Sequence, residues 1–209
     1  MYEEIKSLAR EKRLSYNIKS DQISLSLIRK IYKTEGIKLT SPISTKWRFK
    51  KLRAAYFNDG YEAEVLINNK LPKEARIFSL IHELKHHFTD TGLLDGNMLS
   101  CSDISYNSQP IIEKLAEVFA AEFLFPEQEF LQTIKEYGIT PQNIQPEFVV
   151  RYKKRLGNVP ISYTFLKKRL EWFKFISRGA YDKIKFKNLE YDMFGKPFYL
   201  RKRSFPKFY

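Results

Sequence analysis

The sequence predicts an α+β fold, in which a small β-sheet packs on two long helices and a helical, basic region follows at the C-terminus. Three observations support this prediction. Short runs rich in β-branched and aromatic residues stand between residues 36 and 68, separated by turn residues. Two runs with helical periodicity follow, and a proline marks the start of each, Pro72 and Pro110. The chain has 209 residues, of which 43% are hydrophobic, so it is long enough to bury one sizeable core.

The first element that we expect is an amphipathic helix over residues 20–36, with Ser20 or Asp21 as its cap and Gly36 as its stop. Three strands should follow, in the segments GIKLT, KLRAAYFND and AEVLIN. The turn residues NDG, Asn58–Gly60, suit a hairpin between the second and third strands. These strands would form the small sheet.

Pro72 suits the first turn of a helix that runs to about Thr89. The next segment, Asp90–Gln109, is polar and contains glycine, so we expect a loop there. Pro110 opens a second helix, PIIEKLAEVFAAEFLF, which Pro126 ends.

The composition changes after about Ile139, where the chain becomes basic and aromatic, so we expect two domains, residues 1–139 and 140–209. The formal net charge of +13 favours polyanions or acidic partners. A single cysteine excludes an internal disulfide and fits a reducing compartment. The charged N-terminus lacks the apolar core of a signal peptide, and no run approaches the roughly 20 apolar residues of a membrane span. We therefore expect a cytoplasmic protein that does not contact a membrane.

All three histidines of the chain lie in one short stretch, SLIHELKHHFT. His82, Glu83 and His86 fit the H-E-x-x-H pattern of zinc hydrolases. On a helix, with about 100° per residue, His82 and His86 lie about 40° apart, and Glu83 lies within about 100° of His82. Two neutral histidines one turn apart can bind zinc, and a glutamate beside them can act on water. We expect one zinc ion per chain, with His82 and His86 as ligands and Glu83 as the catalytic base.

The opposite side of this helix carries four apolar residues, Ile77, Ile81, Leu84 and Phe88. We therefore expect one apolar face directed to the core and another face that presents the imidazoles and the carboxylate. His87 points about 100° away from His86, so we expect it to serve helix packing or support of a ligand rather than catalysis.

The second helix offers a third zinc ligand. Glu113 and Glu117 are four residues apart and therefore stack on one face. Ala116 and Ala120 share that side, and their small size would let the helix approach a neighbour closely. We expect Glu113 to bind the metal and Glu117 to orient a ligand histidine. Glu122 projects roughly opposite Glu113 and is a poorer candidate.

The two segments HELKHHF and EKLAEVFAAEFLFP together resemble the ImmA/IrrE family of zinc metallo-endopeptidases. The family's second motif reads approximately E-x-x-A-[ND]-x-F-A-x-x-[LF]-[LM]-x-P. Seven residues fall on that pattern: Glu113, Ala116, Phe119, Ala120, Phe123, Leu124 and Pro126. The sequence departs from it at Glu117, where the family more often has Asn or Asp. A carboxylate is therefore still present, but on a side chain one methylene longer than that of Asp. The segment VVRYKKRLGNVPISYTFLKKRLEWF resembles the family's helix-turn-helix-like segment.

The resemblance implies a zinc endopeptidase whose substrate is a helix-turn-helix transcriptional repressor, cleaved to release genes after DNA damage or phage-related stress. Two alternatives come from other classes. The chain could be a nucleic-acid-binding regulator in which the metal senses or stabilises, or the partner subunit of a toxin–antitoxin pair. The presence of Glu83, the base that hydrolysis needs, favours the enzyme.

The C-terminal third carries two basic clusters on candidate helices, and both lie near aromatic residues. Such residues suit phosphate contacts and base stacking, and DNA is a candidate partner. A surface that docks an acidic repressor, or a solvated basic face, fits equally well. The residues of the two clusters are Lys153, Lys154, Arg155, Lys167, Lys168 and Arg169.

Cys101 lies in the segment between the two helices that bear the expected ligands. It can be an ordinary thiol in a polar loop. Alternatively, its thiolate could occupy the open position of the zinc and displace the water that catalysis needs, which would keep the enzyme latent.

Overall fold

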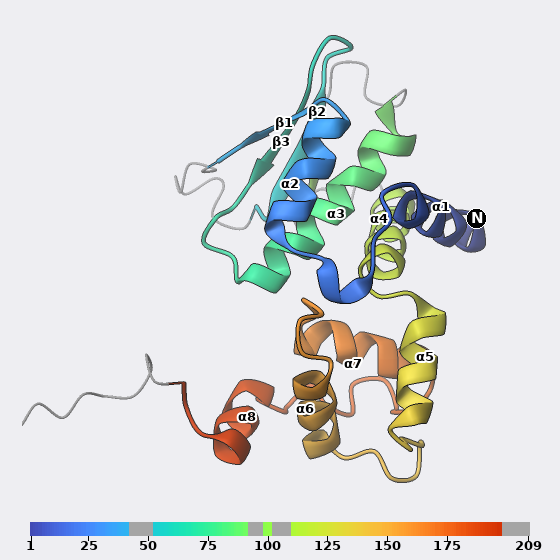
Figure 1. The fold of residues 1–209 in the computed structure, drawn as a ribbon, viewed down its shortest axis with the longest axis vertical. Helices are drawn as coiled ribbons and strands as arrows, with labels where there is room; N and C mark the ends of the chain where they lie inside the picture. Colours follow the sequence, from blue (N-terminus) through green and yellow to red (C-terminus); the bar gives the residue numbers. More distant parts are fainter. Residues whose placement is uncertain (42–51, 92–97, 102–109, 198–209) are drawn as a thin grey trace, which may run out of the picture. The chain divides into compact units, whose positions relative to one another are not determined.

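The structure is a computed structural model of the chain, and it describes residues 1–41, 52–91, 98–101 and 110–197 (Figure 1). It contains helices and a mixed sheet, so the predicted α+β class is confirmed. The elements follow in this order: α1 (Tyr2–Ser15), η1 (Ser20–Gln22), α2 (Leu25–Thr34), β1 (Ile37–Thr40), β2 (Ala54–Asn58), β3 (Ala63–Ile67), α3 (Lys73–Thr89), β4 (Met98–Cys101), α4 (Pro110–Leu124), α5 (Glu127–Glu136), α6 (Pro146–Arg155), α7 (Tyr163–Trp172) and α8 (Phe186–Phe194).

Contacts divide the chain into two compact units. The N-terminal unit comprises Met1–Thr133 with Gly157–Ser162, and the C-terminal unit comprises Ile134–Leu156 with Tyr163–Tyr209. The expected division at residue 139 stays a prediction. None of the helices in the described ranges is both long enough and apolar enough to span a membrane.

The sheet of the N-terminal unit has the strand order β1-β3-β2-β4. β1 runs parallel to β3, whereas β2 runs antiparallel to both β3 and β4. The three predicted strands and the hairpin between β2 and β3 are confirmed. In the hairpin, the Asp59 carboxylate accepts hydrogen bonds from the N–H groups of Tyr61 and Glu62, and Gly60 adopts a φ of +87°.

β4 corrects one expectation, because it lies within the segment Asp90–Gln109, where a loop was predicted. Its backbone pairs with β2 from Ala54↔Cys101 to Phe57↔Met98. Strand formation depends on the partner that a segment meets in the fold, so the polar composition around it was a poor guide.

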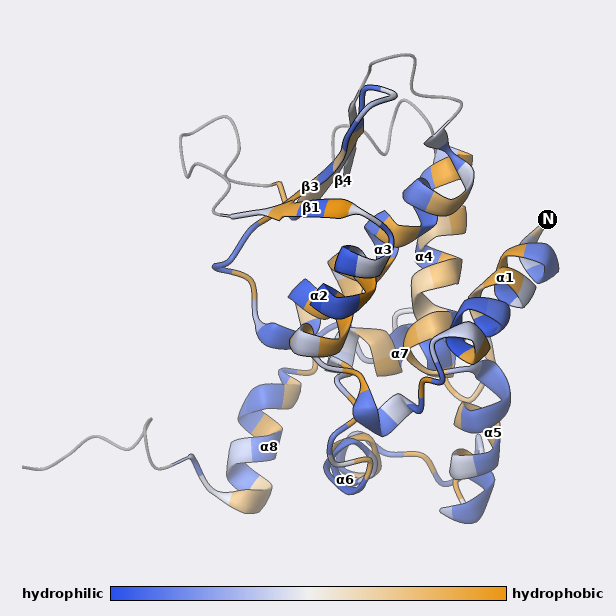
Figure 2. Ribbon diagram, turned by 45° about the horizontal axis from the view of Figure 1, so that its top comes forward, coloured by the Kyte–Doolittle hydropathy of each residue, from blue (hydrophilic) through white to orange (hydrophobic). Residues whose placement is uncertain are grey.

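The sheet places one face against the helices. On β2, Ala54 and Tyr56 are buried, and the register sets them opposite the buried Ile67 and Val65 of β3. Figure 1 shows α2 and α3 beside the sheet, and α3 contacts both β2 and β3. α4 packs on α3, and α1 packs on α4. Figure 2 shows α4 as hydrophobic along most of its length, as expected for a helix between two neighbours.

The start of α2 differs from the prediction. A short 3₁₀ turn occupies Ser20–Gln22, and the helix begins only at Leu25. Its cap is Ser24, whose hydroxyl accepts a hydrogen bond from the N–H of Leu27 at 3.2 Å. Ser20 instead lies buried beside Arg13, whose guanidinium donates to its hydroxyl at 3.1 Å. The predicted stop is confirmed, since Gly36 follows the helix with a φ of +70°.

The C-terminal unit is helical, as expected. Tyr163 of α7 stacks on Phe186 of α8, with ring centroids 5.1 Å apart. Tyr181 packs edge-on against Phe186, and its hydroxyl donates to the carbonyl of Ile144 at 3.2 Å. α6 and α7 are joined by residues 156–162, a longer connection than the 3–4-residue turn of most helix-turn-helix motifs.

Candidate active site

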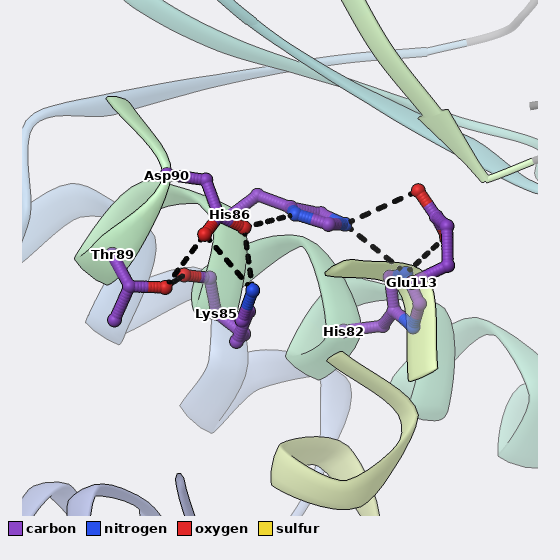
Figure 3. Close-up of polar contacts among 6 residues, drawn as sticks. All are labelled: His82, Lys85, His86, Thr89, Asp90 and Glu113. Atoms are coloured by element: carbon purple, nitrogen blue, oxygen red, sulfur yellow. Dashed lines mark hydrogen bonds and ion pairs between the residues drawn. The ribbon is translucent and has the colours of Figure 1, made fainter. Parts of the chain in front are cut away.

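The site forms where α3 and α4 pack together (Figure 3). His82 and His86 lie one turn apart on α3, and Glu113 lies in the first turn of α4. Nε2 of His82 lies 3.2 Å from Nε2 of His86 and 3.1 Å from Oε2 of Glu113. Nε2 of His86 lies 3.8 Å from Oε1 of Glu113. All three side chains are buried.

The orientation of His86 is set by a carboxylate. Nδ1 of His86 lies 2.7 Å from Oδ2 of Asp90, and because a carboxylate only accepts, Nδ1 is the nitrogen that carries the proton. Nε2 therefore presents a lone pair to Glu113 and His82. This partner was not anticipated, because Asp90 was assigned to the loop that follows the helix. Its four-residue spacing from His86 was the signal that could have found it.

Asp90 is itself held by a buried cation. Nζ of Lys85 lies 2.9 and 2.7 Å from the two oxygens of Asp90, and Lys85 is only 1% exposed. The Thr89 hydroxyl adds a hydrogen bond to Asp90 at 3.0 Å. Burial alone would raise the pKa of Asp90, but the hydrogen bonds from His86 and Lys85 outweigh it and hold that pKa below its usual value. The carboxylate is therefore ionised when it orients His86.

Glu83 is buried between these groups and the core. Its side chain is 0% exposed, and neither of its oxygens has a hydrogen-bond partner. Burial raises the pKa of Glu83 well above its usual value, and the charge of Glu113 raises it further. A buried carboxylate without a partner is costly, so its position calls for a functional explanation.

The active helix differs from the expected two-faced arrangement. Ile77, Ile81 and Leu84 are buried as predicted, whereas Phe88 is only partly buried. The polar side chains of the other face are buried as well, namely His82, Glu83, Lys85 and His86. The reason is that α4 covers the side of α3 that the sheet and α2 do not. The site therefore lies inside the unit rather than on an open helix face.

The three convergent side chains fit a zinc ion. Burial lowers the pKa of His82, although the hydrogen bond with Glu113 opposes this effect, so the ring is neutral at pH 7. His86 bonds to Asp90 through Nδ1, so the atoms that converge are its Nε2, the Nε2 of His82 and the carboxylate of Glu113, a donor set that suits a metal cation. Ligand atoms about 2.0–2.1 Å from a tetrahedral zinc lie about 3.4 Å apart. The two Nε2 atoms are 3.2 Å apart, and Oε2 of Glu113 is 3.1 Å from that of His82, which are both close to this value.

The sequence model of the IrrE N-terminal-like domain, peptidase family M78, matches residues 44–155, which is more than half of the chain. The chain belongs to this family. Membership of this family supports metallopeptidase activity. Within the described residues, His82, His86 and Glu113 form a group that could hold the metal. No curated protein matches the chain.

Within this family site, the role expected for Glu117 stays a prediction. Glu117 lies one turn beyond Glu113 on α4 and is partly buried, with its carboxylate 3.7 Å from Lys114. Its charge acts on His82 and raises the pKa of that ring, but less than Glu113 does. The expectation that Glu122 points away is consistent with the structure. Glu122 pairs with Arg10 at 3.0 Å and accepts a hydrogen bond from the N–H of Glu127.

His87 takes part in packing, as expected. Its Nδ1 lies 3.0 Å from the Tyr56 hydroxyl, and its Nε2 lies 3.8 Å from a carboxylate oxygen of Glu35. Its ring also meets Tyr56 edge-on. These contacts join α3 to β2 and to the end of α2.

The remaining candidate residues stay predictions. The backbone of Cys101 lies in β4, but its side chain falls outside the described part of the structure. In the C-terminal unit, Lys153, Lys154 and Arg155 lie over the rings of Tyr163, Phe194 and Tyr137, respectively. Lys167 forms an ion pair with Asp182, and the buried Arg169 lies over Phe165. Several of these cations therefore already contact groups within their own unit. Lys168 is the sixth residue of the two basic clusters.

Proposed function

We propose that the protein is a zinc-dependent endopeptidase that hydrolyses a peptide bond of a helix-turn-helix transcriptional repressor. The observation that carries the reaction is the convergence of His82, His86 and Glu113 beside the unpartnered carboxylate of Glu83. Membership of the peptidase family supports the same reaction. The substrate class is supported by the resemblance of the two motifs to the ImmA/IrrE metallo-endopeptidases.

The ligand set suits zinc. His82 and His86 would hold it through Nε2 and Glu113 through its carboxylate, which leaves a fourth position for water or substrate. When bound, zinc polarises a carbonyl oxygen and lowers the pKa of water. Asp90 keeps the His86 ring in the orientation and tautomer that a ligand needs, and Lys85 keeps Asp90 in place.

Glu83 would carry the proton. It takes the proton from the attacking water as the water oxygen bonds to the carbonyl carbon, and it delivers that proton to the leaving nitrogen as the C–N bond breaks. Burial raises the pKa of Glu83 in the metal-free protein, and a cation held by the neighbouring ligands would oppose this and favour the ionised carboxylate that accepts the proton.

We further propose that cleavage takes place in the cytoplasm and relieves repression of stress, phage or mobile-element genes. A repressor acts on intracellular DNA, and the single cysteine of the chain fits a reducing compartment.

The test uses the zinc-loaded full chain and a helix-turn-helix repressor, for which the adjacent reading frames are the first place to search. Intact-mass spectrometry should detect two fragments whose masses add to that of the repressor plus one water. Glu83→Gln should produce these fragments about 10²–10⁴-fold more slowly. A repressor that stays intact in the presence of the zinc-loaded protein would contradict the proposed substrate, and equal fragments from the Glu83→Gln protein would contradict the proposed base.

A further inference from the structure

A cavity that opens to solvent lies in the N-terminal unit, and none of the metal ligands lines it. It has a volume of about 390 Å³ and is lined by one face of α2, the strands β1 and β3 and the first half of α3. None of the residues that line it belongs to the site described above. The volume falls within the range of small-molecule sites, about 300–1,000 Å³.

The floor of this cavity is apolar. Tyr32, Ile37, Ile67 and Leu80 line it and are all buried. Leu25 and Leu39, which are partly buried, extend the same surface. Apart from Tyr32 these side chains are aliphatic, so the floor suits a hydrocarbon group rather than a polar one.

The walls of the cavity are cationic. Arg29 and Lys33 lie one turn apart on α2, and Arg76 reaches it from α3. The other polar residues that line the cavity, Ser41 and Asn69, are uncharged. Among the described residues, no carboxylate lines the cavity and none forms an ion pair with these three cations. The sequence also contains no Asp or Glu between Glu35 and Asp59.

Arg76 shows most directly that a partner is missing. Its Nε is buried and has no hydrogen-bond partner, which is an unfavourable state for a charged donor. A guanidinium presents its N–H groups as a fork that matches a carboxylate or phosphate, and a second guanidinium, that of Arg29, stands on the facing helix.

We propose that this cavity binds a small amphipathic anion, whose carboxylate or phosphate pairs with Arg76, Arg29 and Lys33 and whose aliphatic part lies on the floor. The combination of cationic walls and an aliphatic floor selects this class of ligand over a sugar or a cation. The ligand would also contact the active helix, since Leu80 stands two residues before His82 and its carbonyl accepts a hydrogen bond from the Tyr32 hydroxyl at 2.7 Å.

The experiment titrates the full chain with three probes that share one hydrocarbon tail, each kept below the concentration at which it forms micelles. The probes are octanoate, octyl phosphate and octanol, and binding is measured by isothermal titration calorimetry. At least one anion should bind saturably at one site per chain, at least tenfold more tightly than octanol. The tighter of the two anions identifies the head group. Saturable binding of neither anion, or equal binding of octanol, would overturn the proposal.

Variants locate the site. Arg76→Gln should weaken anion binding at least tenfold, and Arg29→Gln, at an exposed position where folding is safe, should weaken it at least threefold. Lys30→Gln is the matched control, because Lys30 is an exposed cation on α2 that does not line the cavity, and it should bind as the unchanged protein does. Undiminished binding by Arg29→Gln, or an equal loss in Lys30→Gln, would show that the anion binds elsewhere.

Discussion

Asp90 accepts a hydrogen bond from Nδ1 of His86 at 2.7 Å, and this single contact determines which nitrogen of the ring faces Glu113. Carboxylates in this position raise the basicity of a ligand histidine and hold its ring in place. We expect Asp90→Asn to weaken zinc binding by about 10–100-fold. Competition with a chromogenic chelator measures this change.

The control for that variant is Lys85→Met. It removes the cation that holds Asp90 but keeps the bond between Asp90 and His86. The free energy of unfolding should fall by about 1–3 kcal/mol, because Asp90 loses a buried hydrogen-bond partner. The zinc affinity should change far less than in Asp90→Asn. If the two variants lose zinc alike, Asp90 supports the fold rather than the ligand.

Glu83→Gln should separate metal binding from catalysis. The amide keeps the shape of the side chain but cannot accept the proton, so repressor cleavage should fall by about 10²–10⁴-fold. Zinc content, measured by atomic emission on the same preparation, should stay at one ion per chain. Glu62→Gln, at an exposed position in the hairpin, should match the unchanged protein in both measurements. Normal turnover by Glu83→Gln is the result that would exclude Glu83 as the base.

Glu113 and Glu122 form a matched pair, since both are buried carboxylates on α4 that point to different partners. Glu113→Ala should lose most of the zinc while the rest of the fold persists. Glu122→Ala should keep the zinc but lower the free energy of unfolding by about 1–3 kcal/mol, because it leaves the N–H of Glu127 at the start of α5 without its acceptor and removes the ion pair with the half-exposed Arg10. Metal content and a urea titration of both proteins give the answer. If only Glu122→Ala lost zinc, Glu113 would not be the third ligand.

The basic clusters of the C-terminal unit allow a test of DNA binding. If they contact phosphates, the logarithm of the association constant for a short duplex should fall linearly with the logarithm of the salt concentration. Reversal of Lys153, Lys154 and Arg155 to glutamate should reduce that slope by about 3, at roughly 0.9 per phosphate contact. The control reverses the same number of exposed cations of the N-terminal unit, namely Lys30, Lys70 and Lys73. Equal effects of the two triple variants, or no binding at low salt, would argue against a DNA site in this unit.

The ligand set was predictable from sequence because its geometry is local. His82 and His86 are one helical turn apart, so any helix through Pro72 and Thr89 brings their rings to the same face. Glu113 required a further step, the packing of a second apolar helix, and the alanines on its Glu113 side suggested that close approach. Asp90 was missed because it lies at the helix end, where the composition indicates a loop.

The remaining errors concern contacts that only the folded chain creates. The cap of α2 is Ser24 rather than Ser20, because Ser20 is engaged by Arg13 of α1, and Ser24 is the residue left to bond the first turn. β4 was missed because its strand depends on pairing with β2, some 40 residues earlier in the chain. The cavity beside Arg76 was invisible in the sequence, since its walls come from four separate elements.

The depth of the metal site has a kinetic consequence. His82 is 3% exposed, His86 0% and Glu113 2%, so the three ligand side chains cannot turn away from the ion while the surrounding chain stays packed. Zinc would therefore leave only during brief local opening, so the rate of zinc release would report the rate of that opening. As chelator concentration rises, the rate of zinc loss should reach a plateau set by the opening rate alone. Amide hydrogens of α3 in the same protein should exchange through the same opening event. The residence time of the ion would then depend on the local opening of this one helix.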